Sequence, residues 1–398
     1  MNKIFEYLKG DRAIWLVVIF LSFISIVEVY SSTSMLAHKF QQGNTAYYAI
    51  KHLGFMLMGF GCMFFFCKFT HKTLPKVAFG FLVVSCVILL LTLITGESTN
   101  EAKRWFTIPL LGISFQPSDM AKMSLMIYLA DVLSVPQQSP GDKRNTFFKC
   151  VGAIGAVCAL ILPANFSTAM LVGISALSVL VVARIPFKWI AFVILLAVAM
   201  FFLYVGFVKI TGSNSRIGTW TKRMETFFQE GDRQADFQSK QSKIAISIGG
   251  ILGKGPGNSD QRNALPHPYS DFIFSIVAEE FGIGGCLLVI AAYLIFFFRC
   301  IMIVKNHDRP FGAYLVVGLA LNVVLQALAN ILVATGIMPV TGQPLPFVSM
   351  GGSSMLFTSM SVGIILNVSR YSGKHEEISE IEEDQDVEEI VDYPFMAG

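Results

Sequence analysis

Residues 272–298 read FIFSIVAEEFGIGGCLLVIAAYLIFFF, an apolar run that contains just two charged side chains, Glu279 and Glu280. A helix needs about 20 apolar residues to cross the hydrocarbon core of a bilayer, so this run is long enough to span a membrane. Nine further apolar runs occur along the chain. The expected fold class is therefore all-α, a polytopic membrane protein with about ten transmembrane helices. The ten predicted ranges are 13–30, 52–67, 77–95, 120–134, 148–163, 168–183, 187–208, 272–298, 311–335 and 354–371.

The composition excludes an ordinary soluble protein. Hydrophobic residues make up 54% of the chain and charged residues only 14%, whereas a soluble domain has about 25% charged residues. The seven cysteines all lie in apolar runs, without metal-ligand spacing, so we expect neither a disulfide framework nor a zinc site. The glycine-rich stretch 249–257 lacks the spacing of a phosphate-binding P-loop or a dinucleotide fingerprint, which argues against ATP or NAD use.

Charge divides the chain into two parts. Ten of the 27 acidic residues lie in residues 372–398, whereas residues 1–371 hold 29 Lys and Arg against 17 Asp and Glu. We predict a membrane domain over 1–371 and an acidic, disordered cytoplasmic tail over 372–398. The basic body suits anionic phospholipid or a polyanionic substrate, although topology signals alone explain most of it. No nucleic-acid partner is expected.

The distribution of Lys and Arg predicts the orientation. One set of short loops and chain ends holds sixteen of these residues and the opposite set holds four. Because the Lys and Arg bias of short loops sets orientation, both termini are predicted to be cytoplasmic. The long polar segment 209–271, between the seventh and eighth spans, is then extracytoplasmic. It shares that face with the loops 96–119 and 336–353.

Ionisable residues at membrane boundaries are functional candidates, because such groups are costly there. Asp271 precedes the 272–298 run, where capping of the following helix is the simpler explanation. Asp119 and Lys122 lie three residues apart at the start of another span, where they could simply pair with each other. The uncharged 336–353 loop, rich in Gly, Pro and hydroxyls, is either a re-entrant loop lining a substrate groove or a plain connector.

Over nearly all of residues 13–371 the sequence resembles the SEDS family of bacterial shape, elongation, division and sporulation proteins, which includes FtsW and RodA. The resemblance rests on short motifs spread along the chain. They are Lys103-Arg104-Trp105, Gln116-Pro117-Ser118-Asp119 with Lys122, Gln238, Gln241-Ser242, Gly249-Gly250, Gly253-Lys254-Gly255, Ser259-Asp260-Gln261-Arg262, Leu265-Pro266, Ser270-Asp271-Phe272-Ile273-Phe274, Glu279-Glu280, Asn330, Gly336, Pro339, Gly342, Leu345-Pro346-Phe347 and Ser349 to Ser354.

The resemblance implies an inverting peptidoglycan glycosyltransferase that polymerises lipid II at the outer face of the bacterial cytoplasmic (inner) membrane. It also implies a class B penicillin-binding transpeptidase as partner. The pattern at Ser259 to Arg262 is closer to the division branch than to the elongation branch, so septal localisation and divisome membrane proteins are expected. An elongation polymerase and a lipid II flippase remain alternatives, as does a purely structural scaffold. A flippase would need polar residues through the whole bilayer.

In this reaction a sugar hydroxyl attacks an anomeric carbon and expels a polyprenyl diphosphate. The resemblance makes Asp271 the catalytic residue, and its predicted place at the outer membrane face suits a base. Cations suit the departing diphosphate, whereas amides and hydroxyls can orient sugars. A divalent cation held by Asp271 or Asp119 could share the task, but nothing in the spacing demands one. The predicted substrate-binding residues are Arg104, Asp119, Lys122, Arg223, Gln261, Arg262, Ser349 and Ser353.

The chain departs from the family pattern at several positions. Asp119 stands where a Glu is usual, and His267 where a Glu is usual after Leu-Pro. The family's Pro-Asp-Leu-Gly-Thr is replaced in residues 163–168 by PANFST, so an acidic role there is lost or moved. Some division-branch members carry a Lys where Thr341 stands. None of these changes affects Asp271.

Overall fold

The structure is a computed structural model that describes residues 9–68, 73–95, 97–99, 102–108, 113–135, 139–211 and 233–372. Two predictions lie outside the described residues. They are the role of Arg223 and the disordered tail, of which only the first residue is described.

Long helices overlap all ten predicted ranges, and the all-α expectation is confirmed. They are α2 (Arg12–Ser32), α4 (Thr45–Lys68), α5 (Leu74–Thr95), α6 (Pro117–Ser134), α7 (Pro140–Ile161), α8 (Phe166–Val182), α9 (Phe187–Thr211), α12 (Ile273–Lys305), α13 (Pro310–Ala334) and α14 (Gly352–Ser372). Within the described residues, seven helices are long and apolar enough to cross a membrane, namely α2, α4, α5, α7, α12, α13 and α14. The chain is thus a multi-pass membrane protein, while the number of ten spans stays a prediction.

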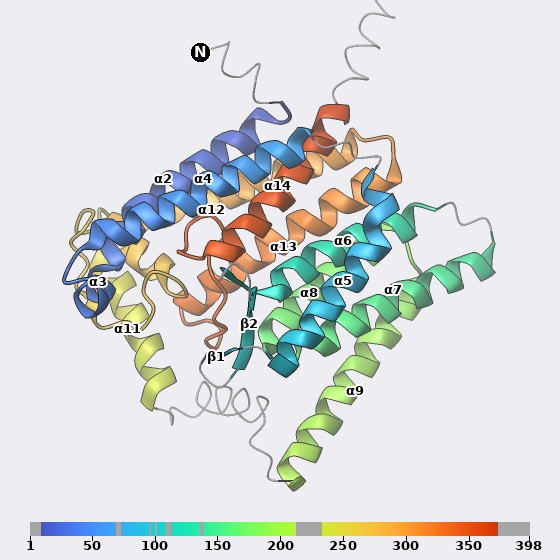
Figure 1. Cartoon of the computed structure of the whole chain (residues 1–398), viewed down its shortest axis with the longest axis horizontal. Coiled ribbons are helices and arrows are strands. Elements are labelled where there is room, and N and C mark those ends of the chain that lie inside the picture. Colours follow the sequence, from blue (N-terminus) through green and yellow to red (C-terminus); the bar gives the residue numbers. More distant parts are fainter. Residues whose placement is uncertain are drawn as a thin grey trace, which may run out of the picture.

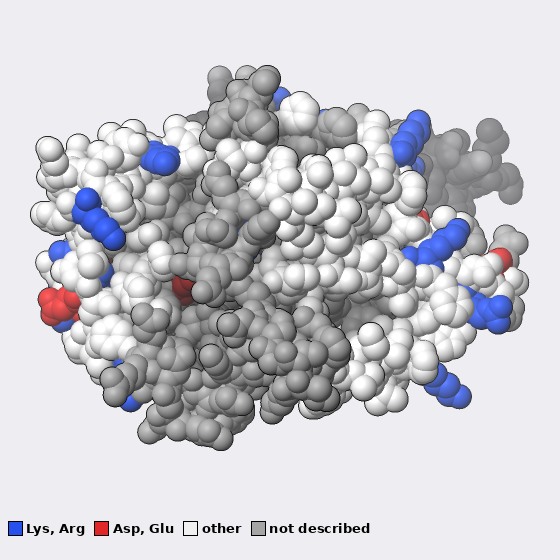
Figure 2. Space-filling view, turned by 60° about the horizontal axis from the view of Figure 1, so that its bottom comes forward, with Lys and Arg blue, Asp and Glu red and all other residues white. Residues whose placement is uncertain are grey.

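The long helices lie side by side, with α13 in contact with α6, α8, α12 and α14 (Figure 1). Figure 2 shows that most charged side chains in that view lie toward the two ends of the molecule, and that the described surface between them is mostly uncharged. This is the distribution that a bilayer requires, because charges are costly in its core.

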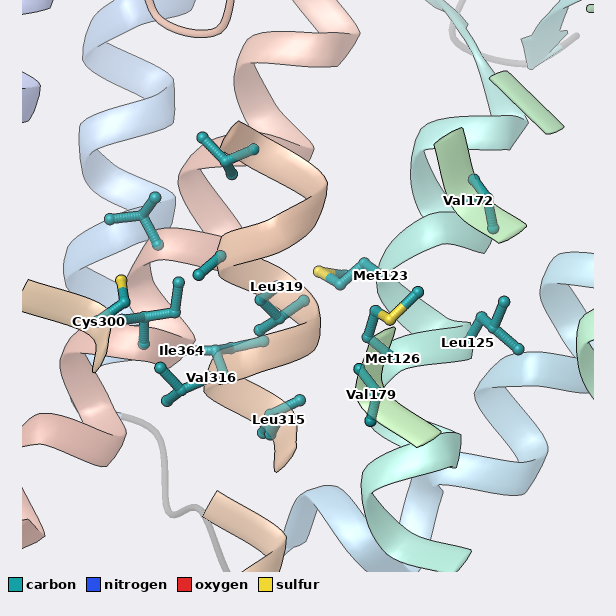
Figure 3. Packing of buried hydrophobic residues seen from close by; sticks show 14 of the residues in the cluster. Met123, Leu125, Met126, Val172, Val179, Cys300, Leu315, Val316, Leu319 and Ile364 are labelled. Carbon is teal, nitrogen blue, oxygen red and sulfur yellow. The ribbon is translucent and has the colours of Figure 1, made fainter. Parts of the chain in front are cut away.

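The interior between the helices is filled by apolar side chains. Met123 and Met126 of α6 face Leu315 and Leu319 of α13 (Figure 3). The two helices approach closely because Gly318 has no side chain: a Cβ at this position would lie 2.8 Å from Met126 Sδ. Apolar side chains therefore fill the contact between α6 and α13 at this level.

A small antiparallel sheet interrupts the helical fold between α5 and α6, in the order β1 (Glu97–Thr99), β2 (Ala102–Ile108), β3 (Ile113–Phe115). Phe106 and Phe115 are directly paired, and their rings meet edge to face at 6.0 Å. The sequence analysis did not predict these strands. Their importance for the site is that β2 carries Arg104.

Helix α12 is broken at Gly282, whose φ of 67° and ψ of −164° are not helical. The 249–257 turn, which follows α11 (Arg233–Gly249), repairs the break. Lys254 N and Gly255 N donate to the carbonyls of Glu279 and Glu280, at 3.0 and 2.9 Å, and Gly250 O accepts from Ile283 N at 2.9 Å. The glycine-rich turn therefore supplies the hydrogen bonds that the broken helix lacks.

The segment 335–351, called here the α13–α14 loop, is packed inside the bundle, with Phe347 and Val348 buried. Side chains from three helices donate hydrogen bonds to its carbonyls. Ser25 Oγ of α2 bonds Val348 O at 2.7 Å, Tyr293 of α12 bonds Pro346 O, and Gln326 Nε2 of α13 bonds Pro344 O at 2.9 Å. Irregular backbone at membrane depth is tolerated in this environment, because these carbonyl oxygens are satisfied by protein donors.

Candidate active site

Asp271 lies in the turn before α12, where Phe272 occupies the N-cap position and no side chain caps the helix. The sequence allowed Asp271 to cap this helix, but Asp271 does not hold the N-cap position. Asp271 is half-buried, and its Oδ1 accepts a hydrogen bond from Ser270 Oγ at 2.9 Å. Burial, and then the negative charge of Asp271, raise the pKa of the neighbouring Tyr269 above its ordinary value.

The backbone of Asp271 is fixed by a side chain from α13. Asn330, which is 1% exposed, donates from Nδ2 to Asp271 O at 2.9 Å and to Gln343 O at 2.7 Å. Gln343 in turn donates from Nε2 to Thr168 Oγ1 at 2.8 Å. One amide group therefore joins the turn that carries Asp271 to the α13–α14 loop.

The α13–α14 loop also holds the residues just before Asp271. Ser349 Oγ donates to Ser270 O at 2.6 Å and accepts from Leu345 N at 2.7 Å. Met350 N donates to Tyr269 O at 2.9 Å. These bonds stabilise one position of the turn, so Ser349 has a structural use in addition to its predicted contact with sugar.

Arg104 approaches Asp271 from the sheet. Its Nε donates to Ala164 O at 3.0 Å, which fixes the guanidinium next to the start of α8. A Cβ built on Gly342 would lie 3.5 Å from Asp271 Oδ2 and 4.0 Å from Arg104 Nη1. The carboxylate and the guanidinium therefore come within 4.0 Å of one common point, although they are far apart in the sequence.

Asp119 and Lys122 form an ion pair at 2.7 Å, as one of the two sequence interpretations predicted. The ammonium also donates to Gln326 Oε1 at 2.9 Å, and Gln326 holds Pro344 O. Gln326 lies one turn of α13, about 6 Å, from Asn330. Through Gln326, the ion pair is thus connected to the α13–α14 loop, which Asn330 connects to Asp271. The two attachments lie one turn of α13 apart.

Two cavities of about 20 Å³ flank these groups, each large enough for one water molecule. The first is lined by Arg104, Gln116, Ser118 and Asn165, among others. The second is lined by residues that include Asp119, Lys122, Gln326 and Ser361. Both cavities are bounded by hydrogen-bonding groups as well as apolar side chains.

Ser353 and two further predicted residues have contacts within the chain. Ser353 Oγ accepts from Gln116 N at 3.3 Å, next to the start of α6. Arg262 Nη1 donates to Gly257 O at 2.6 Å and to Ser31 Oγ at 3.2 Å, and Gln261 N donates to Glu279 Oε2 at 3.2 Å. Gln261 and Arg262 therefore belong to the turn around the broken helix, and their contact with substrate stays a prediction.

Glu279 and Glu280 are fully buried, and their oxygens are occupied by donors from the 249–263 segment. Glu279 accepts from Asp260 N at 2.9 Å and from Lys254 Nζ at 3.1 Å. Glu280 accepts from Gly257 N at 2.9 Å. These two carboxylates therefore stabilise the fold of residues 249–263, the segment that leads to Asp271.

Within the described ranges, no group of three or more His, Cys, Asp and Glu side chains is placed to hold a metal ion. Asp271 and Asp119 are bonded separately, to Ser270 and Lys122. A divalent cation at either carboxylate stays an open prediction.

The sequence analysis missed the residues that assemble the site. Asn330 and Gly342 were noticed only as family motif residues, and Gln326 and Gln343 were not singled out. A polar amide on a buried helix face was the available signal for Asn330 and Gln326. No sequence signal gives the contacts of Gln343 and Gly342, because these depend on how the α13–α14 loop is packed.

The chain was compared with known proteins. Residues 11–374 match the FtsW/RodA/SpoVE family, which is described as "Cell cycle protein". A relative named probable peptidoglycan glycosyltransferase FtsW, from Geobacter sulfurreducens, is 30% identical over 370 residues, covering 92% of this chain and 96% of the relative. Stage V sporulation protein E of Bacillus subtilis is 30% identical over 374 residues, covering 91% and 97%.

Solved structures share the fold. One chain of a peptidoglycan synthase complex, studied for the coordination of polymerization and crosslinking, superposes with a TM-score of 0.73 at 22% identity, covering 91% of this chain and 98% of that chain. The rod shape determining protein RodA of Thermus thermophilus gives a TM-score of 0.65 at 21% identity, covering 91% and 97%. The match over residues 11–374 places this chain in the FtsW/RodA/SpoVE family of cell cycle proteins.

Proposed function

We propose that this chain is a peptidoglycan glycosyltransferase that polymerises lipid II at the outer face of the cytoplasmic membrane. Relatives at 30% identity carry that enzyme name. The observation that carries the proposal is that Asp271 and Arg104 both lie close to Gly342. This place is at the start of α12, whereas Arg299 is near the other end of the same helix. A base and a cation at one point are what a glycosyl transfer with a diphosphate leaving group requires.

In the proposed mechanism, the carboxylate of Asp271 accepts the proton of the attacking sugar hydroxyl. Arg104 stabilises the negative charge that develops on the departing diphosphate, and Lys122 does so deeper in the bundle. Asn330 and Ser349 fix the backbone of the Asp271 turn, so that no reorganisation is needed during reaction. Arg223, Gln261, Arg262 and Ser353 are further proposed contacts with the substrate.

Orientation follows the charge pattern. Arg299, near the other end of α12, pairs with Asp11 at 2.6 Å, and Lys9 and Arg370 lie near the same end. We place this basic end, with both termini, in the cytoplasm and Asp271 outside. The domain division at residue 371 belongs to the same proposal.

A lipid II flippase is the rival function, and the packing of the bundle argues against it. A flippase would need a polar path through the whole bilayer. The second cavity, lined by Asn322 and Ser361 among others, has a volume of only about 20 Å³. Toward the basic end, Met126, Leu315 and Leu319 fill the interior (Figure 3). This packing favours chemistry at the outer face over transport.

A class B penicillin-binding transpeptidase is the proposed partner, in support of which a structural neighbour comes from a peptidoglycan synthase complex. A septal role with divisome proteins is supported by relatives named FtsW, and the elongation role is the alternative. A tagged copy should concentrate at midcell if the role is septal. Concentration along the lateral wall would contradict it.

The proposed activity is tested with the purified full chain. Lipid II is supplied in detergent and glycan strands are separated by electrophoresis, while a parallel liposome assay measures lipid II scrambling. We expect strands and no scrambling above protein-free liposomes. Scrambling without strands would support the flippase, and neither activity would support a scaffold.

A further inference from the structure

Gly342 marks a point in space that is bounded by the two charged groups of the site. Among described residues, only Asp271 Oδ2 at 3.5 Å and Arg104 Nη1 at 4.0 Å lie within 4 Å of a Cβ built there. Both distances are those of ordinary van der Waals contact. An atom at this point would touch both a carboxylate oxygen and a guanidinium nitrogen.

The position of this point is rigidly set. Gln343, the next residue, is held by Asn330, and the same amide of Asn330 holds Asp271 O. Arg104 is held by Ala164 O. Gly342 itself has a φ of +66°, which side chains rarely tolerate, so the absence of a Cβ is built into the loop.

We propose that the space beside Gly342 is where the reacting atoms of the two sugars meet, and that the missing side chain at this position is what leaves room for them. This inference rests on the proposed glycosyltransferase function. The sugar hydroxyl lies on the Asp271 side and the anomeric oxygen of the diphosphate on the Arg104 side.

The proposed step is balanced. The hydroxyl oxygen forms a bond to the anomeric carbon, and its proton passes to the carboxylate of Asp271. The bond from the anomeric carbon to the diphosphate oxygen breaks, and its electron pair leaves with the diphosphate, whose charge faces Arg104. A cavity lined by Arg104, Asn165 and Ser118 lies beside the same guanidinium.

Gly336 provides a matched control in the same loop. Its φ of +71° imposes the same backbone strain as that at Gly342. A Cβ at Gly336 would instead meet Lys243 Cε at 2.0 Å, the far end of an exposed and flexible side chain. A substitution at Gly336 therefore reports strain in the loop without filling the space between Asp271 and Arg104.

The test compares Gly342→Ala and Gly342→Asn with Gly336→Ala and Gly336→Asn, measuring kcat, KM and the thermal midpoint of the full chain with lipid II. We expect Gly342→Ala to lower kcat about 100-fold, the loss that small misplacements of reacting groups cause. Gly336→Ala should stay within about threefold of wild type, because it changes no contact of the reacting groups.

The asparagine variants separate space from strain, because Asn tolerates positive φ better than Ala but is larger. If the space is needed, Gly342→Asn is less active than Gly342→Ala; if strain alone matters, it is more active, and the inference is wrong. Equal activity of the Gly342 and Gly336 variants also overturns it. An inactive wild type overturns the proposed function and the inference together. Should Gly342→Ala fail to fold, Gly342→Asn carries the test.

Discussion

Carboxylates occur at two places near the start of α12, and the protein treats them differently. Glu279 and Glu280 are fully buried, and backbone N–H groups of the 249–263 segment donate to their oxygens. Asp271 is half-buried and accepts a hydrogen bond from Ser270 Oγ, and its carboxylate and the guanidinium of Arg104 both lie within 4.0 Å of a Cβ built on Gly342. The first place buries its charges completely among hydrogen-bond donors, whereas the second keeps a half-buried carboxylate within reach of a cation.

The difference separates carboxylates that stabilise the fold from one that can act on a substrate. An oxygen that already accepts several hydrogen bonds in a buried site has little capacity to take a proton from a hydroxyl. Asp271 instead has its backbone fixed by Asn330 while its side chain reaches the surface of the site. We therefore expect mutations at Asp271 to lower activity with little effect on stability, and mutations at Glu279 or Glu280 to lower stability with little effect on activity.

The largest expected effect is on activity, from Asp271→Asn. Removing a positioned general base should lower glycan strand formation by about 10² to 10⁴-fold. The thermal midpoint should change little, because the amide keeps the size of the side chain and can still accept from Ser270. A variant that unfolds as its activity falls would place Asp271 among the structural carboxylates.

Glu280→Gln should produce the converse result. The amide nitrogen of Gln would face the backbone N–H of Gly257 in one orientation and that of Ser259 in the other, so a buried donor loses its acceptor either way. We expect the free energy of unfolding to fall by about 1–3 kcal/mol. Chemical denaturation in detergent measures this loss, while strand formation per folded molecule should stay near wild type. A selective loss of activity would remove the distinction between the two places.

Asn330→Leu sharpens the comparison, because it loosens the backbone of Asp271 without touching the carboxylate. Asp271 O and Gln343 O both lose their donor, and turnover should fall about tenfold. Tyr293→Phe is the control, since it releases Pro346 O of the same loop and leaves the bonds to Asp271 and Lys122 in place. It should lower turnover less. The same loss from both substitutions would mean that the loop as a whole, and not the Asp271 contact, is what matters.

The smallest expected effect is that of Asp260→Asn in the structural segment. Hydrogen bonding to Lys254 holds the pKa of Asp260 below 3.8, and bonds to Asp260 and Glu279 raise the pKa of Lys254 above 10.5. The stabilisation by Asp260 is present above pH 3.8 and is lost as pH falls through the lowered pKa. Wild type should therefore melt slightly higher than Asp260→Asn at pH 7, and the difference should shrink as the pH falls below 3.8. A difference that persists in acid would contradict the ion pair as its source.

Much of the fold could be predicted from the sequence, because long apolar runs such as 272–298 leave few alternatives in a membrane protein. The break at Gly282 and the small sheet could not. The break depends on hydrogen bonds from the 249–257 turn. The sheet places short strands between two helices, and their pairing is a tertiary contact that local patterns do not reveal.

The ionisable residues of the site could be predicted from the sequence, but their arrangement in space could not. Asp271, Asp119 and Lys122 stood out because charge near a membrane is costly, and Arg104 stood out through the family resemblance. Neither the closeness of Arg104 to Asp271 nor the connection of Lys122 to the α13–α14 loop could be derived, because the partners come from distant parts of the chain. For the same reason Gln261 and Arg262 were grouped with Asp271, although the structure bonds them within the other carboxylate region.

The most direct test of the role of Asp271 is to load the purified Asp271→Asn variant with lipid II and to count bound lipid II and glycan product in the same sample. If the carboxylate acts on the attacking hydroxyl, the variant binds lipid II like wild type and forms no strands above the protein-free background. Strands formed at the wild-type rate by the loaded variant would contradict that role.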